Sequence, residues 1–205
     1  MYYGIQNLDE QIIKKYLNFN NGFFIEVGGN DGITQSNTAF LEFNMGWKGL
    51  LIESIPQKFN QMVKNRANSI CVNTCLSDVD DEIVEFNDVN LMSFVTGARK
   101  SHEDDKNWIL EGEKCQGINS KKYTLKTKKL QTIIEENKIN KIDFFSLDVE
   151  GYELNVLKGI NLNKIRPKYI LIECTHQKEI FEYMSSNGYT CIDKFVVHDF
   201  LFETN

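Results

Sequence analysis

A short apolar run followed by a glycine-rich turn is the feature that most constrains the fold of this chain. Residues 23–27 read Phe-Phe-Ile-Glu-Val and lead into Gly28-Gly29-Asn30-Asp31-Gly32. An apolar run of this length predicts a strand buried on both faces. The glycines predict a turn whose backbone N–H groups approach a ligand at the start of a helix. Such a turn alone is weak evidence, because a tight strand-to-helix connection also favours glycine.

Strands and helices then alternate along the chain. Further strands are predicted over residues 49–53, 70–74, 142–147 and 169–173, with a last pair near 189–192 and 196–202, and helices are predicted between them. This alternation predicts an α/β, doubly wound, Rossmann-like fold. We expect a seven-stranded, mainly parallel sheet with an antiparallel terminal strand.

We expect a single domain over residues 1–205, because 41% hydrophobic and 25% charged residues are ordinary globular values. Residues 1–20 contain a helical pattern that we interpret as a lid or edge helix. Residues 88–120 lack clear periodicity and are long for a loop, which predicts a substrate-covering insertion. The lysine-rich run 121–129 is interpreted as the solvated edge of a strand.

Charge and composition exclude several classes of partner. The net charge is −6, from 23 Lys and Arg against 29 Asp and Glu, so no basic field favours DNA or RNA. The five cysteines form no CxxC pair, which predicts reduced thiols and disfavours a zinc site. No run approaches 18 apolar residues, and no leader segment is evident. We therefore expect a soluble, cytoplasmic protein without a membrane span.

Two carboxylates point to an adenosine-containing cofactor. Glu53 ends the second strand, 21 positions after Gly32, where a carboxylate can accept both hydroxyls of a ribose. NAD and S-adenosylmethionine both satisfy this spacing. Glu26 stands two residues before Gly28, and there it could hold an ammonium group, which NAD lacks. The chain has no Gly-Lys-Ser/Thr motif, so it is not a P-loop protein.

With these motifs the chain resembles the FkbM family of methyltransferases. The resemblance rests on Glu26-Val-Gly-Gly-Asn-Asp-Gly32, on Glu53 with Pro56, on Cys75-Leu-Ser-Asp78, on the segment from Phe145 to Gly159 that contains Asp148-Val-Glu-Gly-Tyr-Glu153, and on Pro167-Lys-Tyr-Ile-Leu-Ile-Glu173. It covers roughly residues 20–200. The resemblance implies a class I methyltransferase fold and S-adenosylmethionine as cofactor.

The resemblance also assigns residues to the parts of that cofactor. Gly28, Asn30, Asp31 and Gly32 would hold the methionine part, and Glu53 would bind the ribose. Leu76, Ser77 and Asp78 would lie beside the adenine, and Asp148 would lie near the sulfonium. Ser93 resembles a family serine near the cofactor, or is an ordinary loop serine. The full expected cofactor set is Glu26, Gly28, Gly29, Asn30, Asp31, Gly32, Glu53, Ser54, Leu76, Ser77, Asp78, Ser93 and Asp148. Asn30 departs from the commoner glycine, but Asn tolerates positive φ.

Family members with assigned activities are similar to O-methyltransferases of sugars, polyketides and other hydroxylated small molecules. We therefore expect methyl transfer to a hydroxyl of a sugar or glycan, within a larger glycan-building polypeptide if the chain is one excised domain. Another small-molecule acceptor, such as a polyketide or lipid head group, is the alternative, followed by a non-catalytic binding module and an NAD-dependent oxidoreductase. Trp108 suits a sugar's apolar face, or equally a core position.

Four residues are candidates for the general base that removes the hydroxyl proton: Asp148, Glu150, Glu173 and His176. All lie at or just beyond the ends of the fourth and fifth strands. Glu150 and Glu173 are alternatively helix-start acids, and His176 is alternatively a residue at a helix start; for Glu153 the helix-start role is preferred. The four candidates together would also suit Mg²⁺ or Mn²⁺. The cluster of His102 with three acids is read as solvated.

Overall fold

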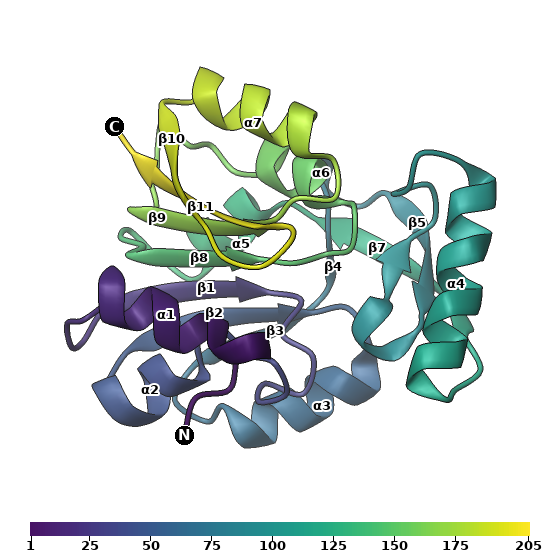
Figure 1. The fold of residues 1–205 in the computed structure, drawn as a ribbon, viewed down its shortest axis with the longest axis horizontal. Helices are drawn as coiled ribbons and strands as arrows, with labels where there is room; N and C mark the ends of the chain where they lie inside the picture. Colours follow the sequence, from purple (N-terminus) through teal and green to yellow (C-terminus); the bar gives the residue numbers. More distant parts are fainter.

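Seven strands form the central sheet of the computed structural model, which describes all 205 residues (Figure 1). They are β1 (Phe23–Val27), β2 (Lys48–Glu53), β3 (Ile70–Asn73), β8 (Phe144–Leu147), β9 (Tyr169–Glu173), β10 (Tyr189–Lys194) and β11 (Asp199–Thr204). Their order is β10-β11-β9-β8-β1-β2-β3. β1 pairs in parallel with β2 and β8, whereas β11 is antiparallel to β9 and β10. The predicted doubly wound sheet with an antiparallel terminal strand is confirmed.

Helices cover both faces of this sheet (Figure 1). One layer contains α1 (Leu8–Lys15), α2 (Ala39–Met45) and α3 (Pro56–Asn65), and the other contains α5 (Leu130–Glu136), α6 (Glu153–Lys158) and α7 (Gln177–Ser186). Alternate strand residues point to opposite layers, as a pleated strand requires. Phe24 packs in the cluster with the first layer, and Ile25 and Val27 pack in the cluster with the second.

The N-terminal helix α1 belongs to the core, so its interpretation as a lid or edge helix is wrong. Leu8, Ile12 and Ile13 are buried and join the cluster that contains Phe24 and Phe144 from the middle of the sheet. The apolar stripe correctly predicts a helix, but only the packing shows which surface the helix covers. A short 3₁₀ turn, η1 (Ile5–Asn7), precedes it.

A second sheet, of four strands, stands beyond the carboxyl ends of the central strands (Figure 1). It consists of β4 (Cys75–Leu76), β7 (Lys121–Lys128), β5 (Ile83–Asp88) and β6 (Phe94–Val95), in that order. The lysine-rich run is therefore a strand, as predicted. β7 pairs with β5 over residues 121–126 and with β4 only at Thr127 and Lys128, so most of the run has one unpaired side. Its lysines at 121, 122 and 126 are exposed, as expected for a solvated edge.

The segment 88–120 is mostly a helix rather than a long loop. It contains a 3₁₀ turn, η2 (Asn90–Met92), and the 15-residue helix α4 (His102–Gln116), which lies on the outer side of the small sheet (Figure 1). Ser101 caps α4 by accepting a hydrogen bond from the backbone N–H of Asp104 at 3.1 Å. The acids after His102 occupy the first turn, where the helix dipole favours them. No helix of the structure has the length and apolar character that crossing a membrane requires.

Candidate active site

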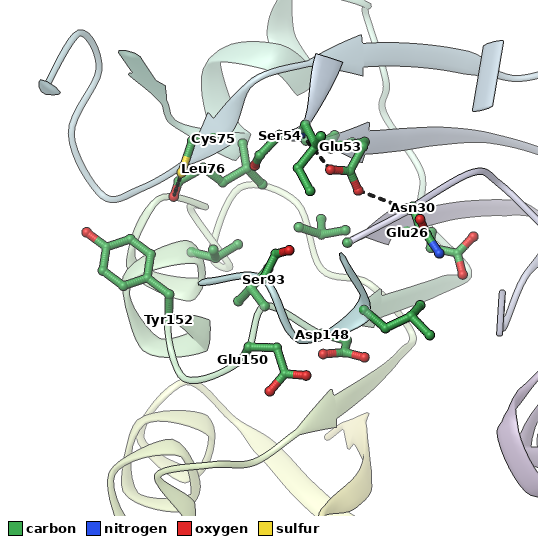
Figure 2. A pocket seen from close by; sticks show the side chains of 18 of the residues that line it. Glu26, Asn30, Glu53, Ser54, Cys75, Leu76, Ser93, Asp148, Glu150 and Tyr152 are labelled. Carbon is green, nitrogen blue, oxygen red and sulfur yellow. Dashed lines mark hydrogen bonds between the residues drawn. The ribbon is translucent and has the colours of Figure 1, made fainter. Parts of the chain in front are cut away.

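A cavity opens where β1, β2 and β8 end and the small sheet begins. Glu26 and Asn30 lie toward one end of it, and Cys75, Leu76 and Tyr152 lie toward the other (Figure 2). Of the residues expected to bind the cofactor, those on the wall are Glu26, Gly28, Gly29, Asn30, Glu53, Ser54, Leu76, Ser93 and Asp148. This position, outside the carboxyl ends of parallel strands, is the usual ligand site of open α/β sheets.

The glycine turn is shaped by a close approach between β1 and the end of β8. Gly28 has φ 83°, and a Cβ there would lie 2.1 Å from the carbonyl oxygen of Asp148. Asn30 also has a positive φ of 47°, as expected for the departure from glycine. Only a residue without a side chain fits at position 28, so the backbone itself forms the wall of the cavity there.

Glu53 is held at the end of β2 by two backbone donors. Its Oε1 accepts from the N–H of Ile55 at 2.7 Å, and its Oε2 accepts from the N–H of Asn30 at 2.8 Å (Figure 2). Burial raises the pKa of this carboxyl to about 7. Each oxygen keeps a second lone pair, so the residue fits a ligand that presents two neighbouring hydroxyls.

Glu26 is already occupied by the protein. Its two oxygens accept hydrogen bonds from Ser36 Oγ, from Thr38 Oγ1 and from the N–H of Asn37, at 2.6–3.1 Å. The guanidinium of Arg66, fully buried, lies 3.4 Å from Oε2. These donors fix the Glu26 carboxylate at the wall of the cavity, and its direct contact with an ammonium group stays a prediction.

Four expected cofactor residues do not line the cavity. Asp31 accepts hydrogen bonds from the N–H groups of Ile33 and Thr34 and so closes its own turn. Gly32 packs against α3, where a Cβ would lie 2.7 Å from the side chain of Arg66. Ser77 and Asp78 follow β4, and the hydroxyl of Ser77 lies 3.2 Å from Asp78. Sequence position placed all four near the cavity, but Asp31 closes its own turn, Gly32 packs against α3, and Ser77 and Asp78 contact each other.

The apolar end of the cavity includes residues that the sequence analysis missed. Ile55, Phe86 and Val95 form one cluster with Cys75, and Tyr152 packs against it. Phe86 and Val95 come from β5 and β6, and no sequence signal placed these strands beside the end of β2. Ser93 does reach the wall, but its hydroxyl donates to Asn90 O at 2.6 Å and accepts from the N–H of Val89 at 2.8 Å.

Three of the four predicted base candidates converge. Carboxylate oxygens of Asp148, Glu150 and Glu173 lie within 4.8 Å of one another. Asp148 is exposed to the cavity; the protein atoms crowded around it and the charges of Glu173 and Glu150 raise its pKa well above the usual range. Burial and Glu173 raise the pKa of Glu150 to about 8, against the opposing effect of Arg99. We call these three residues the carboxylate cluster.

Arg99 neutralises one member of the cluster, with Nη2 2.8 Å from Glu150 Oε2. Glu150 has φ 55°, an uncommon conformation for a residue with a side chain, which aims its carboxylate at this contact and the cluster. The three carboxylates could also hold a divalent cation. Glu153, in the first turn of α6 as expected, is fully buried and accepts from the N–H of Gly151 at 2.7 Å.

His176 lies outside the carboxylate cluster. Its Nε2 is 2.7 Å from the carbonyl oxygen of Ala98, and its side chain lines a second hollow beside α4. A carbonyl oxygen only accepts hydrogen bonds, so Nε2 carries a proton. In the neutral ring Nδ1 is then an acceptor.

A family model described as the methyltransferase FkbM domain matches residues 26–191. No curated protein sequence matches the chain. Among solved structures, TrmK of M. capricolum, in complex with S-adenosylhomocysteine, is similar over 95% of this chain at 12% identity and a TM-score of 0.52. The chain spans 65% of that protein. An S-adenosylmethionine-dependent methyltransferase from Aquifex aeolicus is similar over 95% of this chain and 86% of its own, at 11% identity and a TM-score of 0.48.

Proposed function

Since the chain belongs to the FkbM methyltransferase family, we propose that it transfers the methyl group of S-adenosylmethionine to a hydroxyl of a sugar or glycan. The observation that carries this proposal is the carboxylate cluster of Asp148, Glu150 and Glu173, which reaches the cofactor cavity through Asp148 and Glu150. A hydroxyl acceptor needs a proton acceptor at the reaction centre, and the cluster supplies one.

The cavity offers a matching partner for each part of the cofactor. Glu53 would accept hydrogen bonds from the two ribose hydroxyls through its unused lone pairs. The apolar end, with Ile55, Phe86 and Val95, would hold the adenine, and the turn from Gly28 to Asn30 would hold the methionine part. Asp148 follows β8 directly and lies against this turn through its backbone, so the carboxylate cluster would lie near the methyl group.

When bound, S-adenosylmethionine supplies an electrophilic methyl group on a positively charged sulfur. The acceptor oxygen forms a bond to the methyl carbon while the bond from that carbon to sulfur breaks, and the electron pair stays on sulfur. The hydroxyl proton leaves to the carboxylate cluster.

A polyketide or lipid head group is the alternative acceptor, and a binding module without turnover is the alternative from another class. The binding module is the weaker of the two, since a module that only binds has no use for mutually repelling carboxylates whose pKa values are raised. An NAD-dependent oxidoreductase is disfavoured by the family assignment.

Calorimetric titration with S-adenosylmethionine, S-adenosylhomocysteine and NAD tests the cofactor. Mass spectrometry of sugars, oligosaccharides, phenols and lipid head groups after incubation with S-adenosylmethionine then tests the acceptor. We expect binding of the first two ligands, none of NAD, and one added methyl group on a sugar. Methylation of a phenol or head group alone would replace the sugar in the proposal, and binding of NAD alone would refute the cofactor.

A further inference from the structure

A second hollow, with a volume of about 370 Å³, lies between α4 and the turn that joins β9 to α7. Arg99, Asp104, Asn107 and Glu111 line one side, and Thr175 and His176 line the other. Small-molecule sites usually occupy roughly 300–1,000 Å³. Lys100 also lines the hollow, so two positive side chains, Arg99 and Lys100, face two negative ones, Asp104 and Glu111. Balanced charges with many hydrogen-bond donors and acceptors suit a neutral ligand with many hydroxyls.

The two hollows meet at the ion pair between Arg99 and Glu150. Arg99 lines the second hollow, Glu150 lines the cofactor cavity, and 2.8 Å separates Arg99 Nη2 from Glu150 Oε2. Thr175 and His176 follow Glu173, the cluster member at the end of β9. A ligand in the second hollow therefore contacts Arg99, which is paired with Glu150 of the carboxylate cluster on the side of the cofactor cavity.

Arg99 is held rigidly and retains unused hydrogen-bond donors. Its guanidinium carbon lies 3.6 Å from the centre of the Trp108 ring, while the indole N–H donates to Met92 O at 3.2 Å. Within the protein, the guanidinium donates only to Glu150 through Nη2, and its Nε is buried without a partner. Trp108 therefore orients Arg99 through one face of its ring, and it also lines the hollow. A fixed guanidinium with free N–H groups is preorganised to bind oxygen atoms.

We propose that this second hollow is the acceptor site, in which Arg99 binds oxygens of the acceptor and His176, with Nδ1 as its acceptor atom, receives a hydrogen bond from a neighbouring hydroxyl. The acceptor class is a neutral polyhydroxylated sugar. This inference rests on the proposed function, because it places that substrate at the same reaction centre. It assigns α4 the substrate-covering role and makes Arg99 the residue that orients the reacting hydroxyl toward the carboxylate cluster.

The test fills the hollow while leaving the cofactor cavity intact. Protein loaded with S-adenosylhomocysteine is probed by saturation-transfer NMR with D-glucose, D-galactose, D-mannose and L-rhamnose, and turnover is measured with S-adenosylmethionine. Asn107→Trp blocks the hollow. Lys106→Trp is the matched control, because Lys106 is the exposed neighbour on α4 and does not line the hollow. Arg99→Lys keeps the charge but loses the planar array of N–H groups.

We expect Asn107→Trp and Arg99→Lys to raise the KM for the sugar by roughly ten-fold or more, with S-adenosylhomocysteine affinity unchanged and Lys106→Trp like the parent protein. If a sugar is methylated and Asn107→Trp behaves like Lys106→Trp, the acceptor site is elsewhere while the proposed function stands. If no sugar binds or is methylated although S-adenosylhomocysteine binds, the proposed function fails and the inference fails with it.

Discussion

Glu53 shows how one side chain can be prepared for a ligand by the backbone around it. Two N–H groups fix its oxygens, and burial raises its pKa to about 7. At pH 8 we expect Glu53→Gln to weaken S-adenosylhomocysteine binding by roughly ten- to a hundred-fold, the loss expected for charge-assisted hydrogen bonds to two hydroxyls. Calorimetry measures the change. The matched control is Glu179→Gln, an exposed residue of α7 outside both hollows, and equal affinities for the two variants would contradict the ribose assignment.

At the other end of the reaction, Glu173 contributes to the carboxylate cluster without lining the cofactor cavity. We therefore expect Glu173→Gln to lower kcat by at least roughly ten-fold, since a general base typically contributes 10²–10⁴ in rate and two carboxylates remain. The affinity for S-adenosylmethionine should stay within about two-fold of that of the parent protein, because Glu173 does not line the cofactor cavity. Steady-state kinetics with the methylated sugar measures both. An unchanged kcat would remove Glu173 from the mechanism.

At the scale of elements, the glycine turn depends on how closely β1 approaches the end of β8. Gly28 and Gly97 both have positive φ, 83° and 86°, but only at Gly28 would a Cβ collide with backbone, whereas nothing lies within 4 Å at Gly97. Each alanine variant loses about 1–2 kcal/mol from the backbone conformation alone. We expect Gly28→Ala to lose clearly more, together with cofactor binding. Chemical denaturation and calorimetry compare the two, and equal losses would show that the contact between β1 and β8 is unimportant.

Over the whole molecule, several buried carboxyl groups make stability depend on pH. Burial raises the pKa of Glu153 and of Glu53 to about 7, and burial with Glu173 raises that of Glu150 to about 8. A carboxyl whose folded pKa is raised costs no stability below its unfolded pKa, and it destabilises the fold as pH rises through the folded pKa. The protein without ligand should therefore lose stability from about pH 5 to about pH 8.

Glu153 allows this pH dependence to be tested outside the ligand site, because it is fully buried and lines neither hollow. In Glu153→Gln the amide oxygen can keep the hydrogen bond from the N–H of Gly151. Between about pH 5 and pH 8, we expect the free energy of unfolding of this variant to fall by up to about 3 kcal/mol less than that of the parent protein. The reason is the pKa of about 7 for the Glu153 carboxyl, which the amide lacks. Denaturant unfolding at several pH values measures the effect. If the free energy of unfolding changed with pH equally in the variant and the parent protein, the prediction would be contradicted.

The sequence by itself determined the central sheet and the positions of Glu53 and Asp148 in the cofactor cavity. Apolar runs such as residues 23–27 and 169–173 are too short and too apolar for anything but buried strands, and alternation with helices leaves few topologies. Because parallel strands end at one edge, Glu53 at the end of β2 and Asp148 after β8 had to face the same crevice. These are consequences of local periodicity and connection rules.

Only the tertiary structure decided which predicted side chains are free to bind. Glu26 has the expected position, yet Arg66, distant in sequence, and the turn at residues 36–38 use its oxygens. Likewise, the weak periodicity of residues 88–120 hid α4 and the hollow beside it. Hydrogen-bond saturation and contacts between distant segments depend on the packed geometry, and a single sequence contains no local pattern that reports them.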